Sequence, residues 1–149
     1  MIAKVIAYIT RQRNGIAELL VFEHVDVDAG VQVPKGTMEP NETLEAAVIR
    51  EVREETGLTS FESMSHLGAM IQPPFAGGVE SEEWCFFAMT VDGSTPDAWV
   101  HRVGGKGEDE GMRFRYYWLP LEIELAGRQG NGLHLLSHIV HELHESTRT

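Results

Sequence analysis

Apolar side chains recur at intervals of three and four residues in one polar stretch of the chain. They are Leu44, Ala47, Val48 and Val52. This spacing puts them on one face and predicts an amphipathic helix. Gly57 follows the last turn, where a left-handed cap residue is expected, and Asn41 and Thr43 are alternative caps for the start. A second apolar stripe predicts another helix over residues 131–145. Its members are Leu135, Leu136, Ile139, Val140 and Leu143.

Shorter runs rich in Val, Ile and aromatic residues predict strands. We expect these strands at residues 2–10, 19–22, 31–33, 63–72, 84–91, 99–103 and 114–119. The run at 84–91 is densely apolar, which is typical of a central strand with both faces buried. Two helices among about seven strands predict one α/β domain over residues 1–149, with α/β/α layers and a mixed sheet.

Composition and charge exclude several classes of protein. The chain has 149 residues, a net charge of −11 and a single cysteine, Cys85. The negative charge argues against binding nucleic acid through bulk electrostatics. No apolar run approaches the roughly 18 residues of a membrane span, so no membrane partner is expected. One cysteine excludes an internal disulfide framework and fits a cytoplasmic protein.

Three glutamates share one face of the first predicted helix. Glu51, Glu54 and Glu55 stand at i, i+3 and i+4, and Arg50 and Arg53 flank them. Like charges at this spacing cost roughly 0.2–0.5 kcal/mol per pair, and glutamates near a helix C-terminus oppose the helix dipole. One interpretation is a solvated surface. The other is a set of oxygen ligands of the kind that Mg²⁺ or Mn²⁺ prefers.

The residues around these glutamates match a known motif. Its defined positions are Gly36, Glu42, Arg50, Glu51, Val52, Glu54, Glu55, Gly57 and Leu58. They have the spacing of the Nudix box, so the chain resembles a Nudix hydrolase over residues 36–58. The resemblance implies the Nudix fold, which is of the layered kind expected above. It also implies metal-dependent hydrolysis of a diphosphate linkage in a nucleoside diphosphate joined to another group.

The same resemblance implies roles for the residues of the box. The ligands of Mg²⁺ or Mn²⁺ would be Glu51, Glu54, Glu55 and the carbonyl group of Gly36. Glu51 would alternatively act as the general base on the attacking water. Arg50 would orient the adjacent carboxylates by forked hydrogen bonds, which a lysine could not imitate. Glu42 would bind the metal through water or hold the loop.

A further acidic ligand is expected from a loop, because many family members supply one before their last strand. The loop at 104–111 offers Glu108, Asp109 and Glu110, of which we prefer Glu110. An acidic segment after Gly78 competes with it. Its members are Glu80, Glu82 and Glu83. For each of these acids, a solvated position in an acidic loop is at least as strong an alternative.

Several cationic and aromatic residues are candidates for contact with the substrate. Lys35 stands between Pro34 and Gly36, where it would suit additional phosphates as a point charge. Lys4 and Arg113 are further candidates for phosphate contact, and Phe75 lies in a Pro/Gly loop where it could stack on a base. The other candidates, each more often a surface or core residue, are His24, Arg102, Arg115, Trp84 and Trp99.

Two alternative functions stay open beside the main hypothesis. The tripeptide containing Lys35 also occurs in relatives that hydrolyse dinucleoside polyphosphates or diphosphoinositol phosphates. The rival from another class is a non-catalytic Nudix-like domain that binds nucleotides or regulates, which would be expected to have lost glutamates of the box. Here all of them are kept. Homodimers are common among similar proteins, although no residue of this sequence indicates one.

Overall fold

The computed structural model describes residues 1–74, 77–107 and 109–121. In this part of the chain it contains one helix and a seven-stranded sheet. The helix is α1 (Leu44–Thr56), and the strands are β1 (Ile2–Arg13), β2 (Ile16–His24), β3 (Lys35–Thr37), β4 (Ser63–Gln72), β5 (Glu82–Thr90), β6 (Ala98–Arg102) and β7 (Arg113–Pro120). The helix predicted over residues 131–145 lies outside the described residues.

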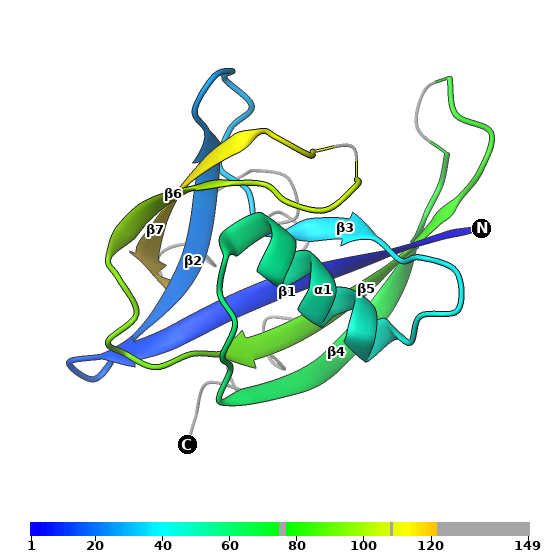
Figure 1. The fold of residues 1–149 in the computed structure, drawn as a ribbon. Helices are drawn as coiled ribbons and strands as arrows, with labels where there is room; N and C mark the ends of the chain where they lie inside the picture. Colours follow the sequence, from blue (N-terminus) through cyan, green and yellow to red (C-terminus); the bar gives the residue numbers. More distant parts are fainter. Residues whose placement is uncertain (75–76, 108, 122–149) are drawn as a thin grey trace.

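The sheet is mixed and is built around β1. Its strand order is β4-β5-β1-β2-β7-β6, and β3 pairs with β1 beside this path (Figure 1). The β1–β5 pair is parallel, whereas the other strand pairs are antiparallel. The turn between β1 and β2 consists of Asn14 and Gly15, both with positive φ, as in a two-residue hairpin of the primed type. A mixed sheet in an α/β fold confirms the predicted fold class.

The central strands are buried on both faces because their side chains alternate between two apolar clusters. On β1, Val5, Ala7 and Ile9 belong to the cluster under α1, and Ile6 and Tyr8 belong to the cluster on the opposite face. The neighbouring strand β5 alternates in the same way. Cys85, Phe87 and Met89 lie on the α1 side, and Trp84, Phe86 and Ala88 lie on the other. The predicted central strand at 84–91 is thus found as β5, and Cys85 is a buried core residue.

Helix α1 packs against β1 and β3, with further contacts to β6 and β7 (Figure 1). Its apolar stripe supplies the buried Ala47, Val48 and Val52. Thr43 is the N-cap, because its hydroxyl accepts a hydrogen bond from the N–H of Ala46 at 3.1 Å. Gly57 caps the other end with a φ of 81°. The predicted apolar face and the C-cap are therefore confirmed, and the N-cap is Thr43 and not Asn41.

The strand predicted over residues 31–33 is wrong. Val31 and Val33 are buried, but Gln32 forms only an isolated bridge with Phe22. Pro34 has no N–H to donate, and its carbonyl accepts from Ala7 at 3.0 Å as the chain turns into β3. The alternation of valines thus reflects burial, and regular pairing with β1 begins only at Lys35.

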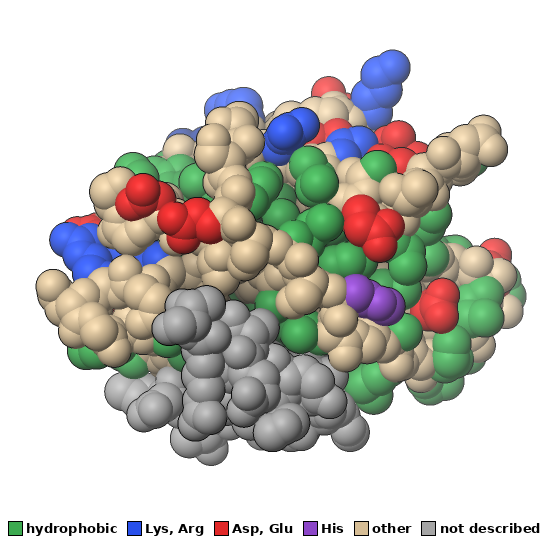
Figure 2. All heavy atoms as spheres, turned by 90° about the horizontal axis from the view of Figure 1, so that it is seen from below, with side chains coloured by type: hydrophobic (Ala, Val, Ile, Leu, Met, Phe, Trp, Pro, Cys, Tyr) green, Lys and Arg blue, Asp and Glu red, His purple; other side chains and the backbone are tan. Residues whose placement is uncertain are grey.

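Two further features concern the surface of the molecule and the length of its helix. On the face seen from below in Figure 2, hydrophobic side chains emerge between acidic ones, and most basic side chains lie toward the rim. In the described ranges, α1 is too short and too polar to cross a membrane.

Candidate active site

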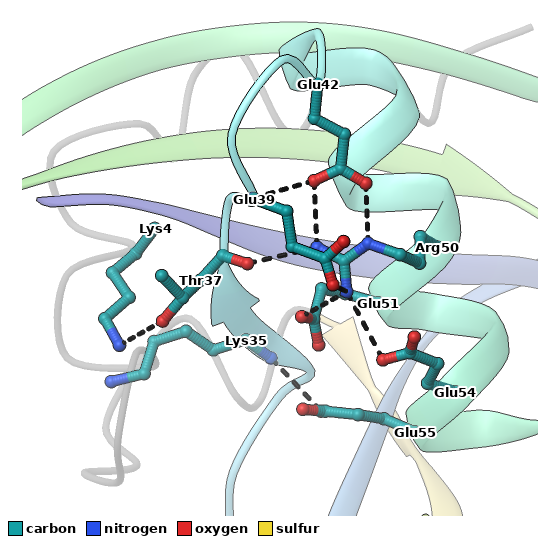
Figure 3. A network of polar contacts seen from close by, with 9 residues as sticks. All are labelled: Lys4, Lys35, Thr37, Glu39, Glu42, Arg50, Glu51, Glu54 and Glu55. Carbon is teal, nitrogen blue, oxygen red and sulfur yellow. Dashed lines mark hydrogen bonds and ion pairs between the residues drawn. The ribbon is translucent and has the colours of Figure 1, made fainter. Parts of the chain in front are cut away.

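The guanidinium of Arg50 is the centre of the polar network on α1 (Figure 3). It holds Glu42 by two bonds, from Nε to Oε2 at 2.6 Å and from Nη2 to Oε1 at 2.9 Å. Its Nη1 donates to Glu51 at 2.8 Å and to Glu54 at 3.3 Å, and Nη2 also donates to the carbonyl of Thr37 at 3.0 Å. One planar cation therefore joins the loop before α1 to two acids of the helix, as a forked donor set allows.

Glu42 fastens the loop that precedes the helix. Its Oε1 also accepts from the N–H of Glu39 at 2.9 Å, and hydrogen bonding to Arg50 lowers the pKa of its carboxyl. Both carboxylate oxygens are thus engaged by protein donors. These are the contacts of a loop-holding residue, which is one of the two roles expected for Glu42.

Gly36 lies directly against the carboxyl group of Glu51. A Cβ built on Gly36 would stand 1.9 Å from Cδ of Glu51 and 2.1 and 2.4 Å from its two oxygens. Real Cβ contacts are essentially not found below 3.0 Å, so any side chain at this position would displace the carboxyl group of Glu51. Glycine thus lets this carboxyl group lie against the backbone of β3.

Glu55 is a buried carboxyl group at the end of α1. It is 3% exposed, and its Oε1 accepts from the N–H of Lys35 at 3.3 Å. Burial raises the pKa of Glu55 well above its usual value, and the nearby charges of Glu51 and Asp109 raise it further. A carboxylate held this far from water needs a cationic partner if it is to stay ionised.

These side chains border a pocket of about 610 Å³. From α1 it is lined by Arg50, Glu51, Glu54 and Glu55, from β3 by Lys35, Gly36 and Thr37, and from the loop after β6 by Val103, Gly104, Lys106, Gly107 and Asp109. The predicted acids of α1 and Gly36 all line this one pocket. Sequence reasoning did not identify Gly105, whose Cβ would lie 2.4 Å from Cδ of Glu54. Its only signal was membership of a glycine-rich loop.

Of the loop acids, Asp109 lines the pocket and Glu110 does not. Burial raises the pKa of Glu51 and Glu55, and the charge of nearby Asp109 raises both further. Glu110 is exposed, and its N–H bonds to the carbonyl of Gly107 in a turn. The geometry therefore favours Asp109 over the predicted Glu110, and Glu108 lies outside the described residues.

Lys35 and Lys4 meet beside the pocket. The ammonium of Lys35 lies 4.3 Å from the ring centre of Trp84, and that of Lys4 donates to the hydroxyl of Thr37 at 2.7 Å (Figure 3). Burial lowers the pKa of Lys35, and the charge of Lys4 lowers it further. Within the described part of the chain, neither ammonium has a carboxylate at ion-pair distance.

The other predicted substrate contacts are dispersed. Arg113 is exposed and pairs with Asp26 at 2.6 Å outside the pocket lining, and Phe75 lies outside the described residues. His24 lines the pocket, but Arg102 and Arg115 do not. Trp84 is buried, as the core interpretation expects. Of the competing acids, Glu80 pairs with the N-terminal amine at 3.2 Å, and Glu82 accepts from Trp84 at 2.8 Å.

A model of the NUDIX domain matches residues 2–134 of this chain. The chain belongs to the Nudix family. No curated protein is a significant match. Among solved structures, the NUDIX domain of Shewanella oneidensis NrtR complexed with ADP ribose has a TM-score of 0.65 and 14% identity, covering 95% of this chain and 87% of that one.

Two further structures share the Nudix fold. A Nudix hydrolase structure from Listeria monocytogenes has a TM-score of 0.65 and 16% identity, covering 96% of this chain and 94% of that one. A C. elegans Ap4A hydrolase has a TM-score of 0.61 and 19% identity, covering 95% and 99%. At such identities the likeness concerns the fold alone.

Glu51, Glu54, Glu55 and the carbonyl group of Gly36 offer oxygen atoms, which suit a hard divalent cation. Carboxylate and carbonyl oxygens are the ligands that Mg²⁺ and Mn²⁺ prefer. Glu55 is a buried carboxyl group whose pKa is raised by burial, so a bound cation would stabilise its ionised form. In residues 1–74, 77–107 and 109–121, no three His, Cys, Asp or Glu side chains already converge as a metal cluster. Here Nη1 of Arg50 bridges Glu51 and Glu54.

Replacing Arg50 with Lys is expected to destabilise the fold by about 1–3 kcal/mol, because charged hydrogen bonds are lost and their partners are half-buried. An ammonium cannot bind Glu42 with two parallel bonds and reach Glu51 as well. Urea unfolding followed by circular dichroism measures the change. Arg53→Lys is the matched control, since Arg53 is exposed on the same helix. Equal stability of the two variants would show that the Arg50 fork contributes nothing.

Proposed function

We propose that this Nudix protein is a hydrolase that uses Mg²⁺ or Mn²⁺ to cleave a diphosphate linkage in a nucleoside diphosphate joined to another group. The observation that supports this proposal most is that the three Nudix-box glutamates of α1 line one pocket together with Gly36. Glu51 and Glu54 face the pocket from α1, and Glu55 reaches it beside the start of β3. A solvated helix face would not need a glycine pressed against one of its carboxylates.

Each residue of the site has a defined part in this proposal. Glu51, Glu54, Glu55 and the carbonyl of Gly36 would hold the metal, and Asp109 is the loop acid placed to join them. Bound metal would offset the charge that develops on the phosphate oxygens. Arg50 binds Glu42, Glu51 and Glu54 at once and thereby orients Glu51 and Glu54. Hydrolysis forms one bond from water oxygen to phosphorus, breaks one bridging bond and releases two phosphorylated products.

A second candidate within the enzyme class is a hydrolase of dinucleoside polyphosphates or diphosphoinositol phosphates. The lysine pair favours it, because two like charges are held close together by neutral partners, a hydroxyl and an indole ring. An additional phosphate group of a longer substrate would relieve their repulsion. The pair borders the same pocket as the acids, so one polyphosphate chain could extend from one group to the other.

A non-catalytic role is the rival from another class. NrtR, which has the same fold, has been solved with ADP ribose and also with a 27mer DNA. The net charge of −11 does not favour DNA as a partner here. The retention of every acid of the box favours catalysis, because binding alone would not require all of them.

A substrate panel run in parallel with Mg²⁺ and Mn²⁺ tests the proposal. We expect hydrolysis of at least one of ADP-ribose, nucleotide sugars, dinucleoside polyphosphates and diphosphoinositol phosphates, with products resolved by anion-exchange chromatography and activity lost in EDTA. The same panel with Lys35→Gln separates the two candidates. A selective rise in KM for the longer phosphate chains supports the second candidate, and an equal effect on all substrates rejects it. Nucleotide binding without metal-stimulated product would establish the regulatory rival.

A further inference from the structure

Each of the last four carbonyl groups of α1 accepts a hydrogen bond. The final four carbonyl groups of a helix have no partner within the helix, and exposed ones are left to water. Glu54 and Glu55 belong to this turn, so the groups that bind its backbone carbonyls influence where their carboxylates lie. The carbonyl of Arg53 accepts from the cap residue Gly57 at 3.0 Å. The carbonyls of Glu54, Glu55 and Thr56 accept from residues outside the helix.

Three aromatic side chains of β6 and β7 supply these donors. Nε2 of His101 lies 3.0 Å from the carbonyl oxygen of Glu54, the hydroxyl of Tyr116 donates to Glu55 at 2.9 Å, and the indole N–H of Trp99 donates to Thr56 at 2.9 Å. Because a carbonyl only accepts, Nε2 of His101 carries the proton in this contact. Burial raises the pKa of Tyr116 well above its usual value, so its hydroxyl stays protonated and remains a donor.

The register of β6 and β7 brings these side chains together. Trp99 pairs directly with Tyr116, and their rings stack with centroids 5.2 Å apart. His101 lies two residues along β6 and therefore projects from the same face as Trp99. The loop that follows adds a fourth donor, because the N–H of Gly104 also bonds to the carbonyl of Glu54 at 3.0 Å. Rigid strands thus hold the backbone of two consecutive acids.

We infer that Trp99, His101 and Tyr116 are positioning residues of the hydrolase site, which fix the backbone of Glu54 and Glu55 and so set where their carboxylates meet a metal ion. This inference rests on the proposed function. The contact of Gly104 with the same carbonyl also ties the loop that carries Asp109 to the helix. Removing one donor lets the last turn move and separates the ligands, while the side chains of the acids remain present.

The test compares Trp99→Phe, Tyr116→Phe and His101→Leu with control variants on β7. Trp118→Phe removes an indole N–H that donates to Pro96 at 2.9 Å, and Tyr117→Phe removes a hydroxyl that donates to Glu23 at 2.8 Å. Neither control touches α1 through the lost bond. Binding of Mn²⁺ is measured from the electron paramagnetic resonance signal of the free ion, with the unfolding temperature and the Mg²⁺ dependence of turnover measured beside it.

We expect each of the three variants to weaken Mn²⁺ binding by about tenfold or more, as is found when groups that orient metal ligands are removed. The controls should bind Mn²⁺ like the wild type even where they lower the unfolding temperature. His101→Gln, whose amide offers an N–H, should regain most of the affinity that His101→Leu loses.

Equal affinities in variants and controls would overturn the inference, as would His101→Gln binding no better than His101→Leu. Wild-type protein that neither binds Mn²⁺ nor hydrolyses any substrate would overturn the proposed function, and the positioning role would fall with it. An active wild type whose three variants behave like the controls would overturn the positioning role alone.

Discussion

Glu54→Gln is expected to lower metal-dependent turnover by about 100-fold or more while the protein stays folded. The amide keeps the size and the hydrogen-bonding oxygen of the side chain, and the side chain is 22% exposed, so little stability is at risk. The loss follows because a metal ion stabilises the transition state by several kcal/mol, and about 1.36 kcal/mol corresponds to each tenfold in rate. Steady-state kinetics with Mg²⁺ titration measure it.

Glu45→Gln is the matched control for this substitution. Glu45 lies in the first turn of the same helix, is exposed and does not line the pocket. Turnover of the Glu45 variant should match the wild type. If Glu54→Gln kept both full turnover and the wild-type response to Mg²⁺, Glu54 would not be a ligand and the assignment of this face would be wrong.

Gly36→Ala is expected to abolish most of the activity through a single methyl group. The new Cβ would overlap the carboxyl group of Glu51, with contacts of 1.9 to 2.4 Å. The flexible side chain of Glu51 moves more easily than the strand, so we expect displacement of that acid with a stability loss of no more than about 1–3 kcal/mol. The measurements are kcat, Mn²⁺ affinity and the unfolding temperature of the same preparation.

Gly93→Ala separates displacement of an acid from steric overlap in general. Its Cβ would stand 2.5 Å from the carbonyl oxygen of Gln12, and Gly93 does not line the pocket. This variant should lose stability but keep the kcat and metal affinity of its folded fraction. Loss of kcat in the Gly93 variant, or full activity in Gly36→Ala, would contradict the proposed role of the glycine.

The helix and its acids were predictable because the relevant signals are local. The apolar stripe of α1, its C-cap at Gly57 and the shared face of Glu51, Glu54 and Glu55 all follow from helical periodicity over a few turns. The position of β3 was not predictable in this way. Val31 and Val33 alternate like a strand, but their burial comes from the core on the far face of the sheet, and pairing with β1 decides the true strand.

The placement of the site residues that are not part of the Nudix box could not be predicted, because their positions depend on tertiary structure. The turn through Gly107 and Glu110 directs Asp109 to the pocket, and composition alone could not choose between neighbouring acids. Nor could it show that Lys35 offers its N–H to Glu55 and its ammonium to Trp84. The donors on β6 gave one weak signal, the spacing of Trp99 and His101 by two residues. Their meeting with α1 follows only from the strand register.

The parallel pairing of β1 with β5 has a consequence for how the molecule reaches its native state. Ile2 pairs with Glu82, so the centre of the sheet joins parts of the chain some 80 residues apart. Closing such a distance costs chain entropy before the contacts form, and topologies of this kind fold slowly. The hairpin of β1 and β2 can form early. The apolar edge of β1 then stays open until β5 arrives, and during that interval it is exposed to association with other chains.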